Sequence, residues 1–93
     1  MISYPMLATR QENGLYKIKI PDLPSPSIPI PEFFDLSGAM DFAKEYIATE
    51  LRGFQKQCKP FPRQSSISEL DFGEEHPVAV YILIYPDDIK EDT

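Results

Sequence analysis

The sequence predicts an α+β fold in which one helix packs on one face of a mainly antiparallel sheet of three or four strands. Three observations carry this prediction: a hairpin pattern at the start, a long amphipathic helix pattern in the middle, and an apolar strand pattern near the end. We expect two layers and the order β-β-β-α-β. The 93 residues suit one domain, so we predict a single domain over 1–93, with its core at about 2–86 and a polar, frayed tail at 87–93.

The start of the chain predicts a β-hairpin. Apolar side chains alternate along 2–9 and again along 15–20, which is typical of strands with one buried face. Between them stands Asn13-Gly14, a pair that favours a tight turn because both residues tolerate a positive φ. Pro5 has no N–H for a ladder hydrogen bond, so we expect the first strand to be at an edge there, or irregular.

The next segment is rich in proline. Residues 21–31 hold five of the ten prolines, and each proline removes a hydrogen-bond donor and restricts the residue before it. A helix is excluded here. Residues 27–34 could form a short, irregular edge strand, and the alternative is an isolated polyproline ligand.

Residues 36–57 show the one clear helix pattern of the sequence. Asp35 or Ser37 is the expected N-cap. Phe42 and Tyr46 form a second apolar row, which makes the apolar face wider than a thin sheet needs and favours contact with a partner. The main apolar face recurs at three- and four-residue steps and consists of Leu36, Ala39, Met40, Ala43, Ile47, Leu51 and Phe54.

An extended connector and a very apolar strand follow the helix. The connector, 58–76, could hold one helical turn. The strand, 77–85, is apolar on both faces, which is typical of a strand that is covered on both sides. The single helix can cover only one face, so we expect a second molecule on the other face, which carries Tyr81, Leu83 and Tyr85. We therefore predict that the protein associates through its sheet, with itself or with a partner.

The net charge of −6 is concentrated in the last third of the chain, where 60–93 carries two basic and eight acidic side chains. No basic patch is visible, which argues against nucleic acid binding, because that affinity comes largely from phosphate neutralisation. An acidic surface suits a basic protein partner, and solubility alone is the simpler explanation.

The sequence also limits the location of the protein. No window approaches the ~18 consecutive apolar residues of a membrane span, and the N-terminus lacks the pattern of a signal peptide. The single cysteine, Cys58, excludes an intramolecular disulfide. We therefore expect a cytoplasmic protein with no membrane contact.

Little in the sequence predicts catalysis. His76, next to Glu74 and Glu75, could act as a general base or a metal ligand, but an exposed loop histidine is the simpler explanation. Nothing places Cys58 beside His76. The four glycines are scattered, unlike those of a phosphate-binding loop. We predict no enzyme activity, no catalytic residue, no metal and no cofactor.

One motif is more specific than these patterns. The second strand runs into Pro-Asp-Leu-Pro, formed by Pro21, Asp22, Leu23 and Pro24. Together with Tyr4-Pro5 in the first strand, and with the patterns of the helix and the last strand, it resembles the HicB-like antitoxins of type II toxin–antitoxin systems. The resemblance covers roughly 2–86 and corresponds to the toxin-binding domain of that family.

The sequence departs from the family in two places. Ser25 stands where the family usually has glycine, and the segment before the helix is longer than usual. Many members also carry a C-terminal helix-turn-helix or ribbon-helix-helix domain that binds DNA. Nothing in this chain resembles such a C-terminal DNA-binding domain, so we expect the chain to bind no nucleic acid.

The resemblance implies a protein that binds and neutralises a small basic ribonuclease toxin of the HicA type, without catalysis of its own. From the residues we add a hypothesis for the partner-binding surface, an apolar centre rimmed by carboxylates: Tyr81, Leu83, Tyr85, Asp87 and Asp88. The alternative is a stand-alone homodimeric α+β module without a toxin partner. A small enzyme is the third possibility, and it would need a pocket with a perturbed carboxylate or His76.

Overall fold

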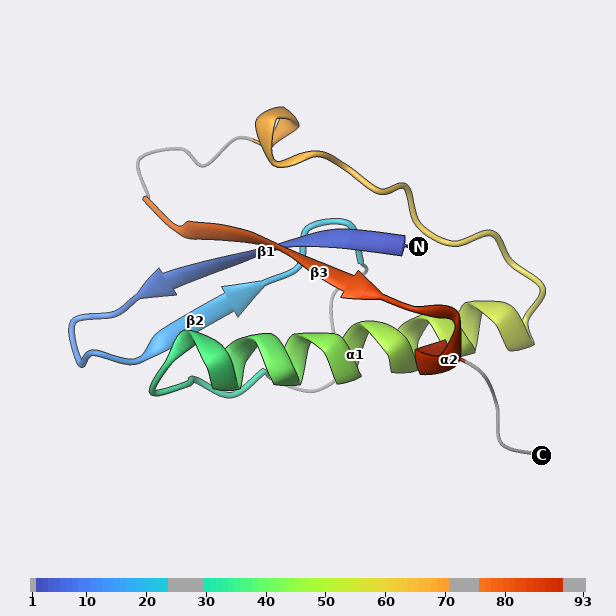
Figure 1. The fold of residues 1–93 in the computed structure, drawn as a ribbon. Coiled ribbons are helices and arrows are strands. Elements are labelled where there is room, and N and C mark those ends of the chain that lie inside the picture. Colours follow the sequence, from blue (N-terminus) through green and yellow to red (C-terminus); the bar gives the residue numbers. More distant parts are fainter. Residues whose placement is uncertain (1, 24–29, 71–75, 90–93) are drawn as a thin grey trace.

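One sheet and one long helix form the fold of this protein (Figure 1). The computed structural model describes residues 2–23, 30–70 and 76–89. Its elements are β1 (Ile2–Arg10), β2 (Tyr16–Lys19), α1 (Leu36–Lys56), the 3-10 helix η1 (Ile67–Glu69), β3 (Val78–Ile84) and α2 (Pro86–Ile89). The three strands are antiparallel in the order β2-β1-β3, and α1 packs against one face of the sheet. The predicted α+β class, with one main helix on an antiparallel sheet, is confirmed.

β1 is the central strand, although it contains a proline. It pairs with β3 over 2–8 but with β2 only over 7–10. If the β2 register continued beyond Lys19 for two more residues, Pro21 would lie opposite Pro5, and neither residue has an N–H to donate. The ladder between β1 and β2 therefore ends before Pro5. At Pro5 the central strand therefore has a partner on its β3 side and none on its β2 side. The prediction that the strand is at an edge there holds for the β2 side only.

The predicted hairpin turn joins β1 to β2, but of the Asn13-Gly14 pair only the glycine has a positive φ. Gly14 has a φ of 85°, which glycine adopts without strain. Its N–H donates to the carbonyl of Gln11 at 2.9 Å, and the N–H of Leu15 donates to the side chain of Asn13 at 3.0 Å. The turn sets the register in which apolar residues of both strands face α1.

The proline-rich segment is described from Ile30 onward. Phe33 forms an isolated antiparallel bridge with Tyr16, in which the two residues exchange hydrogen bonds of 2.7 and 2.9 Å. This part of the segment predicted as a strand, 27–34, therefore contacts β2. The rest of that prediction falls on 24–29, which lie outside the described residues.

Both ends of α1 have defined caps. Asp35 is the N-cap, as predicted, and its carboxylate accepts the N–H of Gly38 at 2.7 Å. At the other end, the N–H groups of Cys58 and Lys59 donate to carbonyls of the last helical turn at 3.1 and 2.9 Å, which is the pattern of a Schellman motif. Cys58 has a φ of 54° there, a conformation that favours glycine.

The core lies between α1 and the sheet. Alternate residues of each strand face the helix, and small alanines on α1 leave room for the larger side chains of the strands. None of the buried core side chains is more than 8% exposed. They are Tyr4, Met6, Ala8, Ile18, Ile20, Leu23, Ala39, Ala43, Ile47, Leu51, Ile82 and Ile84.

The second apolar row of α1 packs within the chain. The ring centroid of Phe42 lies 5.2 Å from that of Phe33 and 6.1 Å from that of Tyr46. All three side chains are half-buried. The segment before the helix thus accounts for this row, and the partner contact predicted for it is not needed.

The start of the tail, which was predicted to be frayed over 87–93, forms part of α2, so this prediction is wrong over 87–89. α2 packs against α1, and Ile89 contacts the core. The guanidinium of Arg52 donates to the carbonyl of Asp88 at 2.7 Å, which ties α2 to the long helix. Residues 90–93 lie outside the described part of the chain.

Candidate protein-binding surface

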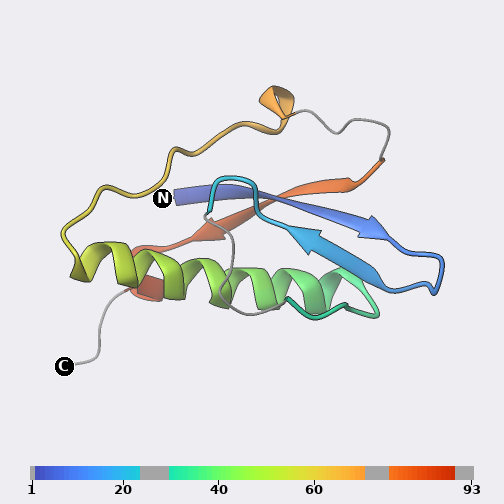
Figure 2. The same cartoon turned by 180° about the vertical axis from the view of Figure 1, so that it is seen from behind.

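The face of the sheet opposite α1, called here the outer face, is partly covered by the connector between α1 and β3. Figures 1 and 2 show the described part of the connector, up to residue 70, passing along the sheet on the side away from the helix. Pro5, which alternates with the core residues of β1, is less than 2% exposed. The chain itself therefore covers the central part of a face for which the sequence predicts a second molecule.

Hydrogen bonds hold the connector against the sheet. The side chain of Gln64 accepts the N–H of Ser3 in β1 at 3.0 Å. The hydroxyl of Tyr81 in β3 accepts the N–H of Ile67 at 2.8 Å. The connector is thus fixed to two neighbouring strands, and η1, which is the predicted helical turn, lies against β3.

The Pro-Asp-Leu-Pro motif fastens the connector at a third point. The carboxylate of Asp22 accepts two hydrogen bonds from Ser65, one from its N–H at 2.9 Å and one from its hydroxyl at 2.6 Å. Leu23 is 8% exposed and belongs to the core. Pro21 is half-buried, and Pro24 lies outside the described residues. Asp22 and Leu23 therefore have structural roles.

An apolar strip stays open on the outer face, beside the connector. It consists of Tyr81, Leu83 and Tyr85, which are 43, 42 and 48% exposed. Their neighbours in the chain, Ile82 and Ile84, face the core and are 4 and 0% exposed. Tyr81 and Leu83 thus lie on the outer face of β3, and Tyr85 follows the last residue of the strand.

The two carboxylates expected at the rim of this surface differ from each other. The carboxylate of Asp88 accepts the N–H of Tyr85 at 2.9 Å and lies 3.7 Å from the ammonium of Lys44. These contacts give Asp88 a structural role in holding α2. Asp87 is exposed and leaves an accessible negative charge just beyond the strip.

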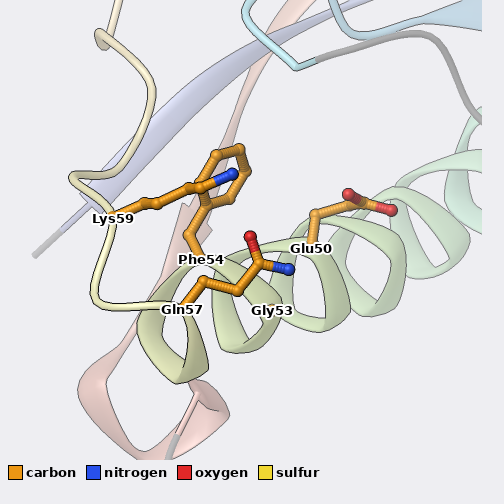
Figure 3. A pocket seen from close by; sticks show the side chains of 5 residues that line it. All are labelled: Glu50, Gly53, Phe54, Gln57 and Lys59. Atoms are coloured by element: carbon orange, nitrogen blue, oxygen red, sulfur yellow. The ribbon is translucent and has the colours of Figure 1, made fainter.

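A hollow at the C-terminal end of α1 is a second surface feature, which the sequence pattern does not predict. Its volume is about 400 Å³. Figure 3 shows that the lining residues belong to the last turns of α1 and the start of the connector, and they are Glu50, Gly53, Phe54, Gln57 and Lys59. These residues offer a carboxylate and an amine but no hydroxyl or thiol nucleophile beside a base.

The residues considered for catalysis stay apart from this hollow. His76 and Cys58 are both exposed, and neither lines it. Within the described ranges, no group of three or more histidine, cysteine, aspartate and glutamate side chains is placed to hold a metal ion.

The fold raises the pKa of two tyrosines. Burial raises the pKa of Tyr4, and the negative charge of Asp22 raises it further. The hydroxyl of Tyr4 donates to the carbonyl of Pro62 at 2.7 Å. Burial, with Glu50 as the second cause, also raises the pKa of Tyr46. Both phenols hold their protons more firmly than a free tyrosine, which suits hydrogen-bond donors and not bases.

Comparisons of the chain with known protein families, with curated proteins and with solved structures found no match. In the part of the chain that the structure describes, no helix combines the length and the apolar character needed to cross a membrane. The surface features of the molecule are therefore the basis on which its function is inferred.

Proposed function

We propose that this protein is an antitoxin-like binding protein that sequesters and neutralises a small basic ribonuclease toxin of the HicA type. The apolar strip is the observation that carries the proposal. Tyr81 and Leu83 lie on one face of β3 and Tyr85 directly follows the strand, and each of these large side chains is more than 40% exposed. Exposed apolar groups of this kind, with aromatic residues among them, are typical of protein-binding sites.

The charge of the molecule supports a basic partner. Residues 60–93 carry eight acidic and two basic side chains, and Asp87 is exposed two positions beyond Tyr85. Opposite charges accelerate the encounter of two proteins and disfavour wrong partners. The same excess of negative charge repels phosphates, so the chain would bind the toxin and not its RNA.

The proposal includes the finer fold and the setting that the resemblance to HicB-like antitoxins implies. A fourth strand beside β2 would extend the bridge between Phe33 and Tyr16 and complete the order β-β-β-α-β. The chain would act in the cytoplasm, as a binding protein without catalysis of its own.

The direct test uses a HicA-type ribonuclease encoded next to this chain in the same genome. RNA cleavage by the purified toxin should stop when the full chain is added. Leu83→Lys should lose this inhibition, because it places a charge within the apolar strip. Phe34→Lys is the matched control and should still inhibit, since Phe34 is 89% exposed and lies outside the strip. Cleavage that continues with an excess of the folded, unsubstituted chain would contradict the proposal.

The second candidate function is a stand-alone homodimeric module without a toxin partner. The specific observation in its favour is the open edge of β3. This edge can be tested with the purified chain alone.

A further inference from the structure

The free edge of β3 is a feature that the antitoxin proposal does not use. Among the described residues, β3 pairs with β1 alone, and Figure 1 shows β3 in front of the other two strands. The strand, Val78–Ile84, contains neither a charged residue nor a proline, although these commonly protect an edge from pairing. Such an edge is a template for another strand.

The ladder with β1 determines which backbone groups of β3 point to this edge. The N–H of Ser3 donates to Gln64 and therefore points away from β3. The direction of the backbone N–H and C=O groups alternates from one residue to the next along an antiparallel strand. Where two facing residues do not hydrogen-bond to each other, the N–H and C=O groups of both point away from the partner strand. Pro5, which has no N–H, fits this pattern. The residues of β3 that turn their N–H and C=O groups to the free edge are therefore Ala79, Tyr81 and Leu83.

We propose that this edge pairs with β3 of a second copy of the chain, antiparallel, around a twofold axis at Tyr81. Tyr81 is the middle residue of Val78–Ile84, so this register pairs the whole strand with its copy. It also aligns Ala79 of each copy with Leu83 of the other. Each of these facing pairs exchanges two hydrogen bonds, so the three pairs form six bonds between the copies.

The side chains fit the same register. On the outer face, the small Ala79 lies opposite the larger Leu83, and the two Tyr81 side chains face each other. On the core side, the facing pairs are β-branched residues, which stabilise neighbouring strands: Val78 with Ile84, and Val80 with Ile82. No facing pair brings like charges together. This self-complementarity favours a second copy over an unrelated strand.

The edge also has a defined end. Tyr85 would be the next residue to turn its N–H outward, but this N–H donates to the carboxylate of Asp88 at 2.9 Å. α2 then begins at Pro86, which has no N–H. The ladder between the copies therefore stops at the end of β3.

The dimer joins two sheets into one and places the two apolar strips together on the outer face. A twofold axis perpendicular to the sheet keeps both copies of α1 on the opposite face. This inference does not rest on the antitoxin proposal, because it concerns the chain without any partner. Self-association and toxin inhibition can therefore succeed or fail separately.

Sedimentation equilibrium of the full chain over a range of concentrations tests the dimer. We expect the mass of two chains for the unsubstituted protein. Tyr81→Lys and Tyr81→Glu each place two like charges at the axis and should raise the dimer dissociation constant at least ~10-fold. Because this register brings position 81 of both copies together, an equimolar mixture of the two variants should dimerise again.

Two controls separate the edge from a general loss of structure. Tyr81→Phe removes only the hydroxyl that accepts the N–H of Ile67 and should remain dimeric. Phe34→Lys adds the same charge at an exposed site away from the edge and should also remain dimeric. Circular dichroism shows whether each variant is folded. If the Tyr81 variants do not fold, Leu83→Lys applies the same test at the pair with Ala79.

Two results would overturn the proposal. One is an unsubstituted chain that stays monomeric at every concentration. The other is a mixture of folded Tyr81→Lys and Tyr81→Glu chains that stays monomeric while the unsubstituted chain is a dimer, because the axis would then lie elsewhere.

Discussion

The two faces of the sheet are covered by different kinds of contact. The face under α1 is packed with apolar side chains, and Ile84 is fully buried there. The outer face is partly covered by the connector. Gln64 accepts a hydrogen bond from β1, Ser65 donates to Asp22 just beyond β2, and Ile67 donates to Tyr81 in β3. Apolar packing buries most of the helix face, although Val78 at the start of β3 is 42% exposed, whereas the polar fastening leaves half-exposed side chains such as Leu83 on the outer face.

This difference separates stability from recognition. Burial of apolar area stabilises a fold by roughly 25 cal/mol per Å², so the helix face carries more of the folding free energy than the outer face does. Side chains on the outer face can therefore be exchanged with less effect on the fold. A binding surface needs side chains that can change to fit a partner without loss of the fold.

Substitutions at two neighbouring residues of β3, one on each face, should differ most in their effect on the free energy of unfolding. Ile84→Ala leaves a cavity in the core and should lower the free energy of unfolding by about 2–4 kcal/mol. Leu83→Ala should lower it by less than about 1 kcal/mol, because this side chain is already half-exposed. Urea denaturation of both variants at one chain concentration checks the contrast. Equal losses would mean that the outer face is packed as tightly as the core.

The polar fastening can be broken at Asp22. Asp22→Ala removes both hydrogen bonds to Ser65 and should lower the free energy of unfolding by about 1.5–3 kcal/mol. Ser65→Ala removes one of the two bonds and should lower it by about 1 kcal/mol. The double variant should lose less than the sum of the two, which urea denaturation can measure. Strictly additive losses would show that the two side chains act independently.

Tyr4 links the two faces, because its ring lies in the core and its hydroxyl donates to the connector at Pro62. Its pKa is raised above the ordinary value of 10.0, so the folded state holds the proton more tightly than the unfolded chain. This contribution to stability is complete below pH 10 and is lost as the pH rises through the raised pKa. The free energy of unfolding should therefore fall on the alkaline side.

Tyr4→Phe tests this dependence. The variant should lose about 1 kcal/mol at neutral pH with the hydrogen bond, and its stability should then fall less steeply toward about pH 11. Urea midpoints at the two pH values give the comparison, and Tyr46→Phe isolates the second tyrosine whose pKa is raised. The same alkaline slope in Tyr4→Phe and in the unsubstituted chain would count against the role of Tyr4.

The smallest expected effect is a gain in the free energy of unfolding from a substitution at Cys58, where α1 passes into the connector. Cys58 has a φ of 54°, which is strained for a residue with a Cβ atom. Cys58→Gly should therefore raise the free energy of unfolding by about 0.5–1 kcal/mol, as measured by thermal unfolding. Cys58→Ala keeps the Cβ atom and is the matched control, which should show no such gain. A loss of stability in the glycine variant would mean that the cysteine side chain contributes contacts of its own.

Local patterns predicted the elements of this fold well. The hairpin with its turn at Gly14, the helix with its N-cap at Asp35, and the apolar strand β3 all follow from spacing and from residues that act on their neighbours. The course of the connector could not be predicted in this way. Its bond from Ser65 to Asp22 spans 43 positions, and no local pattern reports such a contact.

The candidate surface was predicted in part for the same reason. Alternation along β3 separates Tyr81 and Leu83 from the core residues, so the apolar strip could be inferred from the sequence. The contacts of Asp88 with Lys44 and Arg52 depend on how α2 docks on α1, which the composition of the tail does not reveal. The strand order was also hidden, and with it the free edge of β3.

The register that joins Ile2 to Ile84 has a consequence for the order of folding. β1 and β2 are joined by a short turn, whereas β1 and β3 come together only when a loop containing α1 and the connector has closed. Pairing between distant segments is slow, so β3 should join a hairpin and a helix that have already formed. Until it joins, β3 is an unpaired apolar strand, and the edge of β1 that faces it is open. Refolding is therefore the stage at which a high protein concentration most favours aggregation.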